Sequence, residues 1–187
     1  MRPARAVLIG PECTGKTWLA VELAARYGVP GAPEHAREYV ERHGSSLDYA
    51  DVDPIGRGQR AGEDAAIARA VAAGAPLVVL DTDLVSTMVY SRHYYGACPV
   101  WIEEAAARRL GELYLLHQID VPWVEDGRQR EQPARRPELY ERFRAALAGV
   151  SARIVPIHGD WEERLRRAVQ AVDGLLQVPA HAAGERG

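Results

Sequence analysis

Runs of apolar residues of strand length recur along the chain, and polar or glycine-containing segments separate them. Three such runs cover residues 6–9, 77–80 and 113–116. Continuous apolar runs without alternation are typical of strands that are buried on both faces of a sheet. The sequence therefore predicts strands at these three runs, a last strand at residues 153–157, and a further short strand close to residues 30–33.

Patterns of helical length fill the segments between these strands. The predicted helices cover residues 16–26, 36–42, 55–73, 84–94, 99–109, 138–147 and 161–176. Because strands alternate with helices, the sequence predicts an α/β fold of three layers, with a mostly parallel sheet between helices. Residues 44–53 are polar and are expected to form an exposed loop. We expect one domain over residues 1–177 and a disordered tail at 178–187.

A loop that contains two glycines joins the first predicted strand to the first predicted helix. It fits the phosphate-binding pattern G-x-x-x-x-G-K-[ST] without a mismatch. Its backbone N–H groups and the positive end of the helix dipole are suited to hold phosphate groups, with Lys16 on the β- and γ-phosphates and Thr17 on Mg²⁺. The expected nucleotide-binding residues in this loop are Gly10, Glu12, Cys13, Thr14, Gly15, Lys16 and Thr17.

The basic residues of the chain support this interpretation. Lysine and arginine together number 23, and Lys16 is the one lysine among them. Arginine does not substitute for lysine where a compact ammonium group must fit against phosphate oxygens. A composition that uses arginine at every other basic position has therefore kept lysine where the loop requires it.

Two aspartates follow the predicted strand at residues 77–80. Asp81 comes directly after the strand, and Asp83 lies two residues further on. Ligands of parallel sheets bind outside the carboxyl ends of the strands, so we expect Asp81 to hold Mg²⁺ directly or through water. Asp83 is a candidate for the catalytic base. The alternative for Asp83 is a structural one, the capping of the helix that follows.

Glu34 follows the expected second strand and is the candidate carboxylate on the acceptor side of the site. An acid at this point would face the same crevice, where it could bind a sugar hydroxyl or accept its proton. The alternative is an acid at the start of a helix, where it complements the helix dipole.

The segment at residues 121–137 is rich in Pro, Gly and Arg and contains Arg128, Arg130, Arg135 and Arg136. Small phosphotransferases often close an arginine-bearing lid over the transferred phosphoryl group. We therefore expect Arg128 or Arg130 to contact phosphate and to take part in catalysis. A solvated basic loop is the alternative.

Composition and charge narrow the class of protein. A net charge of −3 does not favour nucleic acid as the main partner. Two cysteines without paired spacing are typical of a reduced, cytoplasmic protein. No apolar stretch approaches the ~18 residues of a membrane span, so no membrane partner is expected.

Several segments taken together resemble one known family, the ribosylnicotinamide kinase domain of NadR-type bacterial NAD-salvage proteins. These segments are residues 10–17, 33–39, 81–83, 120–128 and 159–164. The resemblance implies a P-loop kinase core that uses ATP and Mg²⁺ and phosphorylates nicotinamide riboside at its 5′-hydroxyl to give nicotinamide mononucleotide. It also implies that Asp160 and Trp161 lie close to the adenine.

Two other functions stay open at the level of the sequence. The first is a kinase whose acceptor is another nucleoside or a nucleoside monophosphate. A monophosphate acceptor would require additional arginines near Arg37, Arg57 or Arg60. The second is a regulatory module that binds ATP and hydrolyses it slowly. Dependence of ADP release on an added acceptor separates the kinases from the regulatory module.

Overall fold

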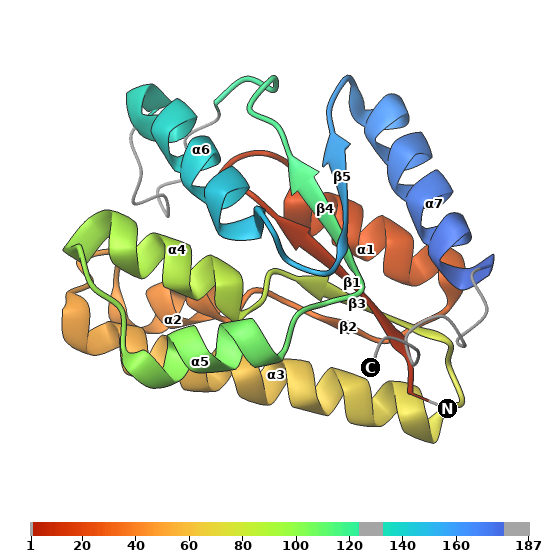
Figure 1. The fold of residues 1–187 in the computed structure, drawn as a ribbon, viewed down its shortest axis with the longest axis horizontal. Coiled ribbons are helices and arrows are strands. Elements are labelled where there is room, and N and C mark those ends of the chain that lie inside the picture. Colours follow the sequence, from red (N-terminus) through yellow and green to blue (C-terminus); the bar gives the residue numbers. More distant parts are fainter. Residues whose placement is uncertain (1, 124–132, 178–187) are drawn as a thin grey trace.

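A computed structural model describes residues 2–123 and 133–177 of the chain. Within these residues, five parallel strands form one sheet in the order β2-β3-β1-β4-β5 (Figure 1). The strands are β1 (Ala4–Ile9), β2 (Gly31–Ala32), β3 (Leu77–Asp81), β4 (Leu113–His117) and β5 (Arg153–Ile157). The predicted parallel sheet is therefore confirmed, although β2 is reduced to two residues.

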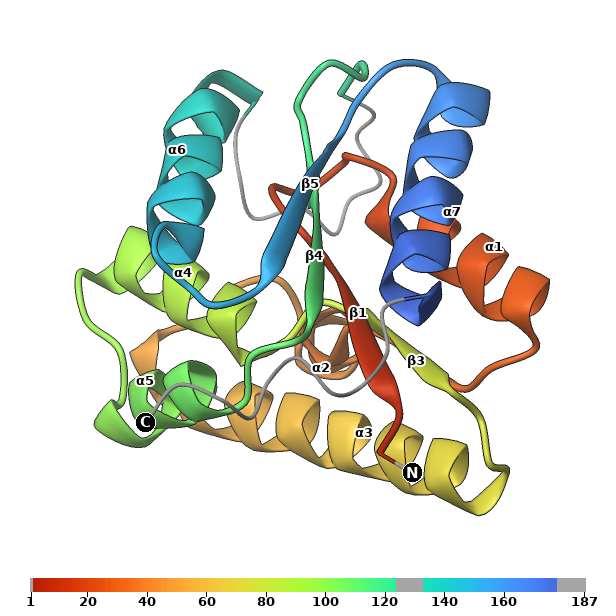
Figure 2. The same cartoon turned by 45° about the vertical axis from the view of Figure 1, so that its right-hand side comes forward.

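Helices cover both faces of this sheet, so that the fold has the three predicted layers. Helices α1 and α7 lie on one face, and α3, α4, α5 and α6 lie on the other (Figure 2). The helices are α1 (Lys16–Tyr27), α2 (His35–His43), α3 (Val52–Ala72), α4 (Leu84–Tyr95), α5 (Val100–Arg108), α6 (Arg136–Leu147) and α7 (Trp161–Gln177). Two short 3₁₀ helices are η1 (Tyr49–Asp51) and η2 (Pro133–Arg135).

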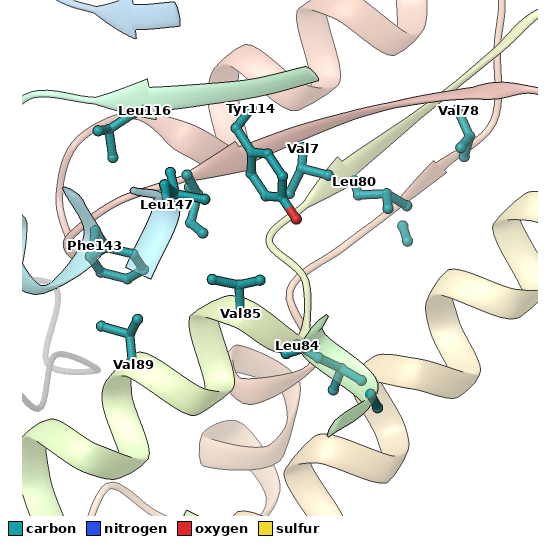
Figure 3. Close-up of a cluster of buried hydrophobic side chains, with 14 of the residues drawn as sticks. Val7, Val78, Leu80, Leu84, Val85, Val89, Tyr114, Leu116, Phe143 and Leu147 are labelled. Atoms are coloured by element: carbon teal, nitrogen blue, oxygen red, sulfur yellow. The ribbon is translucent and has the colours of Figure 1, made fainter. Parts of the chain in front are cut away.

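The central strand β1 shows why a strand of this sheet is a continuous apolar run in the sequence. Ala6 and Leu8 pack against the layer of α1 and α7, whereas Val7 and Ile9 pack against the opposite layer. Figure 3 shows that opposite layer, where Val7 and residues of β3 and β4 face Val85 of α4. Successive side chains of a strand point to opposite faces, and here both faces are buried, so both sets are apolar.

The strand order places the loop after β1 at the middle of the sheet, at the carboxyl ends of the strands. Strand β1 pairs with β3 on one side, with Leu8 opposite Asp81, and with β4 on the other side, with Ile9 opposite Leu116. The chain therefore builds the sheet outward from β1 in both directions. Crevices outside the carboxyl ends of strands form at such a change of direction.

The predicted loop at residues 44–53 is partly helical, which is a correction to the sequence analysis. Asp48 caps η1, because its side chain accepts a hydrogen bond from the backbone N–H of Ala50 at 2.7 Å. Asp51 in turn accepts a hydrogen bond from the backbone N–H of Asp48 at 2.8 Å. This reciprocal capping box lets α3 begin at Val52, three residues before the predicted start.

Three of the sequence-based expectations lie outside the described residues. They concern Arg128, Arg130 and the tail at residues 178–187. Within the part of the chain that the structure describes, no helix is long and apolar enough to cross a membrane.

Candidate active site

The phosphate loop connects β1 to α1 and needs glycine at its two ends. Gly10 and Gly15 have φ angles of 137° and 80°, which side chains rarely adopt. A Cβ atom at Gly10 would lie 2.8 Å from the carbonyl oxygen of His117, and one at Gly15 would lie 2.4 Å from the ring of Trp161. Close packing therefore adds a second reason for glycine at both positions.

Lys16 is folded back against its own loop and is only 6% exposed. Its Nζ donates a hydrogen bond to the carbonyl oxygen of Pro11 at 2.7 Å. The hydroxyl of Thr14 donates to the same oxygen at 2.9 Å, which fixes the curvature of the loop. A cation held at the start of α1 adds to the positive end of the helix dipole, so that the loop is suited to bind an anion.

Two side chains from other elements brace the loop at the carbonyl oxygen of Thr14. The fully buried Arg164 of α7 donates to this oxygen at 3.2 Å and is itself paired with Asp120. His117, at the end of β4, also donates to it from Nδ1 at 2.9 Å. Burial lowers the pKa of His117 to about 3, so this histidine is neutral and carries its proton on Nδ1.

A third brace comes from Arg136 at the start of α6. Its guanidinium donates to the carbonyl oxygens of Cys13 at 3.1 Å and Val121 at 3.2 Å. Arg136 is 6% exposed, and burial lowers its pKa. Arg136 belongs to the basic segment in which Arg128 and Arg130 were the expected phosphate contacts. In the described part of this segment, Arg136 is an arginine that contacts the phosphate loop.

Thr17 and Asp81 form the pair of oxygen donors that was expected at a Mg²⁺ site. The hydroxyl of Thr17 donates to Oδ2 of Asp81 at 2.6 Å. Asp81 is 2% exposed, and among the described residues its Oδ1 has no hydrogen-bond partner. A buried carboxylate oxygen without a partner is costly unless something binds it. Hydroxyl and carboxylate oxygens are ligands that Mg²⁺ prefers, so the pair fits this ion.

Asp83 is held as a structural cap. Its Oδ1 accepts a hydrogen bond from the backbone N–H of Val85 at 3.0 Å, which caps α4. Its Oδ2 accepts a hydrogen bond from the hydroxyl of Tyr114 at 2.6 Å. Figure 3 shows the ring of Tyr114 reaching from β4 toward the segment before α4. Burial raises the pKa of Asp83 to about 6. This geometry favours the capping alternative over the role of catalytic base.

Glu34 stands at the N-cap position of α2 and lines a pocket beside the phosphate loop. Burial in the pocket wall raises the pKa of Glu34 to about 7, the carboxylates of Asp81 and Glu12 raise it further, and the charges of Lys16 and Arg37 oppose this shift. Glu34 therefore lies within electrostatic reach of both the loop lysine and the expected metal ligand. An acceptor-side carboxylate was expected at this position from the sequence, and Glu34 lines the pocket there.

The pocket itself continues from the phosphate loop between α2, α3 and α4. Glu12 and Cys13 of the loop form one end of it, so the pocket shares a wall with the phosphate site. The side chains of four apolar residues and two tyrosines line much of the remainder. They are Val40, Leu47, Val52, Ile55, Tyr90 and Tyr95. An apolar, partly aromatic pocket with a few polar groups is typical of a small-molecule site.

Gln59 and Thr82 are two of the pocket residues that were not expected from the sequence. Gln59 is 3% exposed on α3, and a signal was present, because Ile55, Gln59 and Glu63 share one buried helix face at a spacing of four. Thr82 has a φ angle of 68°, which is rare for a β-branched residue. No pattern in the sequence indicates a left-handed threonine.

Trp161, which the resemblance implies to lie close to the adenine, lies next to the phosphate loop. Its ring packs over Gly15 and meets the ring of Trp18 edge-on, with centroids 5.2 Å apart. Half of Trp161 is exposed (51%), so part of its surface is open to solvent. Asp160 accepts a hydrogen bond from the backbone N–H of Glu163 at 2.9 Å and thereby caps α7.

Two known proteins have sequences similar to this chain. The trifunctional NAD biosynthesis/regulator protein NadR of Escherichia coli (strain K12) is 27% identical over 175 residues, which cover 90% of this chain and 42% of that protein. NadR of Salmonella typhimurium is 29% identical over 124 residues, which cover 64% of this chain and 29% of that protein. The chain thus spans less than half the length of these relatives.

Solved structures of other proteins have a fold similar to that of this chain. A crystal structure of NadR in complex with NR has a TM-score of 0.75 and 26% identity, and the match covers 95% of this chain and 52% of that chain. Thymidylate kinase from Ehrlichia chaffeensis has a TM-score of 0.61 at 13% identity over 94% of this chain and all of the other, which supports the fold alone. The predicted P-loop kinase-like fold and the resemblance to NadR are therefore confirmed.

One family model also matches most of the chain. The model of the AAA_28 family, described as an AAA domain, matches residues 5–164. This range includes the phosphate loop, Asp81 and the brace at Arg164. The chain therefore belongs to the AAA_28 family of AAA domains.

Proposed function

We propose that this chain is an ATP- and Mg²⁺-dependent kinase that phosphorylates nicotinamide riboside to nicotinamide mononucleotide. The observation that carries the proposal is the shared wall between the phosphate loop and the pocket, with Glu34 placed beside both. An acceptor in this pocket would stand next to the phosphate groups of a nucleotide on the loop. The similarity to NadR, solved in complex with NR and in complex with NAD and AMP-PNP, supports the choice of substrates.

The reaction follows from the roles of the residues around the loop. The 5′-oxygen of the riboside forms a bond with the γ-phosphorus of ATP, and the bond from this phosphorus to the bridging oxygen of ADP breaks. Lys16 stabilises the charge on the transferred group. Thr17 and Asp81 would hold Mg²⁺, which neutralises phosphate charge when it is bound.

Glu34 orients the attacking hydroxyl and accepts its proton in this proposal. A carboxyl group whose pKa lies near 7 exists in useful amounts as the base at neutral pH and still binds a proton well. The transition state of phosphoryl transfer is loose, so the position of the carboxylate matters more than its basicity. The N-cap position on α2 provides that fixed placement.

The charges around the pocket fit a nucleoside better than a nucleoside monophosphate. Of the three arginines that a monophosphate would need, Arg37 lines the pocket. Arg57 is instead paired with Asp53 at 2.7 Å and lies over the ring of Trp101. Arg60 faces Asp64 at 3.8 Å. The pyridinium ring of nicotinamide riboside is a cation, which suits the carboxylates and tyrosine rings of the pocket.

The cytoplasm is the proposed location of this activity. Cys13 and Cys98 do not form a disulfide bond with each other, which is in keeping with a reducing compartment.

Release of ADP tests the proposal when it is measured with different acceptors. The purified protein is incubated with Mg²⁺ and ATP alone, with nicotinamide riboside, with common nucleosides, and with nucleoside monophosphates. We expect ADP release to depend on nicotinamide riboside and to be slow with the other acceptors. Equal ADP release with and without an acceptor would instead identify an ATP-hydrolysing module.

A further inference from the structure

One buried amide connects the two carboxylate-bearing segments of the site. The Oε1 atom of Gln59 accepts a hydrogen bond from the backbone N–H of His35 at 3.0 Å. Its Nε2 atom donates to the carbonyl oxygen of Thr82 at 3.2 Å. His35 directly follows Glu34, and Thr82 directly follows Asp81. A single side chain of α3 therefore links the backbone beside the acceptor carboxylate to the backbone beside the metal ligand.

Thr82 occupies a backbone conformation that has to be held in place. Its φ angle of 68° is unfavourable for a β-branched residue, and such strain persists only where surrounding contacts determine the conformation. Its backbone N–H donates to the carbonyl oxygen of Leu8 at 3.0 Å, and its own carbonyl oxygen receives the bond from Gln59. Strain of this kind concentrates at functional sites, and Thr82 lines the pocket.

The residue type at position 59 is determined by its partners. A backbone N–H requires an acceptor, and a carbonyl oxygen requires a donor, so the side chain must present both. The amide also donates to Oε1 of Glu63 at a long 3.4 Å. At 3% exposure, water does not replace these bonds if they are lost. Methionine fills a similar volume but makes none of them.

We propose that Gln59 is a positioning residue for phosphoryl transfer. It holds the strained turn at Thr82 and thereby fixes the position of Glu34 relative to Asp81. This inference rests on the proposed function for its kinetic consequence. The coupling of Gln59 to Thr82 does not depend on that function. The phosphate loop is braced separately by Arg164, His117 and Arg136, so loss of Gln59 leaves the ATP site in place.

The kinetic test compares Gln59→Met with wild type. We expect kcat with nicotinamide riboside to fall about tenfold or more, as expected for a small misplacement of reacting groups. We expect the affinity for a non-hydrolysable ATP analogue to be unchanged. Gln170→Met is the matched control, because Gln170 is exposed on α7 and lies away from the pocket, and it should behave as wild type. A Gln59→Met enzyme with normal kcat would overturn the proposal.

A stability cycle tests the coupling without any substrate. Thr82→Gly removes the strain, because glycine adopts a positive φ freely. The loss of thermal stability caused by Gln59→Met should therefore be smaller in the Thr82→Gly background than in wild type. Equal losses in both backgrounds would refute the coupling, even if the riboside is not the substrate. If Gln59→Met does not fold, Gln59→Glu, which keeps an acceptor for His35, replaces it in both tests.

An inactive wild type identifies a different failure. If wild type releases no ADP with nicotinamide riboside, the proposed function is wrong. The stability cycle then still decides whether Gln59 holds Thr82. Gln59 would be structural only under one combination of results. In that case Gln59→Met costs less stability in the Thr82→Gly background, wild type is active, and Gln59→Met has the wild-type rate.

Discussion

Three carboxylates near the site, those of Asp81, Asp83 and Glu34, differ in their surroundings. Asp81 has one oxygen bonded to Thr17 and one without a partner among the described residues. Asp83 has both oxygens engaged, by the backbone of Val85 and by Tyr114. Glu34 stands in the pocket wall with a raised pKa. Asp83 is therefore a helix cap, and the surroundings of the other two support the proposed roles of metal ligand for Asp81 and acceptor-side carboxylate for Glu34.

Replacement of Glu34 tests its role through pH. The pKa of Glu34 is raised from 4.5 to about 7, so its carboxylate forms as the pH rises toward 7. We expect kcat/KM for nicotinamide riboside to rise with pH up to about 7 and then to level off. Glu34→Gln should remove this rise and lower the rate by about 10²-fold, the usual effect of losing a general base. ATP affinity should stay unchanged.

The same pKa shift makes a prediction about stability. A carboxyl group with a raised pKa in the fold binds its proton more tightly there than in the unfolded chain, so stability falls as the pH rises from 4.5 toward 7. Glu34→Gln should weaken this fall.

Asp83→Asn is the control for the kinetic prediction, since we expect it to lower the melting temperature and to keep the dependence of kcat/KM on pH. Loss of that dependence in Asp83→Asn alone would make Asp83 the base.

Replacement of Asp81 tests the metal site. Asp81→Asn keeps an oxygen for the Thr17 hydroxyl but loses the negative charge that binds Mg²⁺. We expect the Mg²⁺ concentration for half-maximal rate to rise well above the wild-type value. A titration with Mg²⁺ at saturating ATP measures this shift. If the titration is unchanged, another carboxylate holds the metal.

At the scale of elements, the start of α6 is where the basic segment meets the phosphate loop. Arg136 binds the carbonyl oxygen of Cys13, whereas Arg142 on the same helix pairs with Glu138 at the surface. The segment that carries arginines is thus attached to the loop at its C-terminal end. This attachment fixes the start of α6 relative to the phosphate loop.

Arg136→Met tests this attachment. We expect ATP affinity and kcat to fall, in total by about tenfold or more, the scale of one hydrogen bond to a charged group. Arg142→Met is the matched control and should be near wild type. Replacement of both Arg128 and Arg130 by alanine is predicted to cost about two orders of magnitude in rate, by analogy with other phosphoryl-transfer arginines. A normal Arg136→Met enzyme would show that the contact of Arg136 with the phosphate loop is not needed for catalysis.

At the scale of the whole molecule, the sheet and the phosphate loop could be predicted because their signals are local. Buried parallel strands read as apolar runs, and the loop has a fixed spacing. The bonds of Gln59, the left-handed Thr82 and the contact of Arg136 could not be predicted. Each depends on which segments the fold brings together, and a single sequence does not contain that information. For Asp83 the sequence left a base and a helix cap open, and the bonds from Val85 and Tyr114 to its two oxygen atoms favour the cap.

The central claim is that the loop and the pocket form one kinase site. The most direct test is to measure nicotinamide mononucleotide and ADP together, in wild type and in Lys16→Ala, with the fold of the variant checked by its melting temperature. We expect one mononucleotide for each ADP in wild type and neither product in the variant, because the lysine stabilises the transition state. ADP without mononucleotide in wild type, or normal turnover in Lys16→Ala, would contradict it.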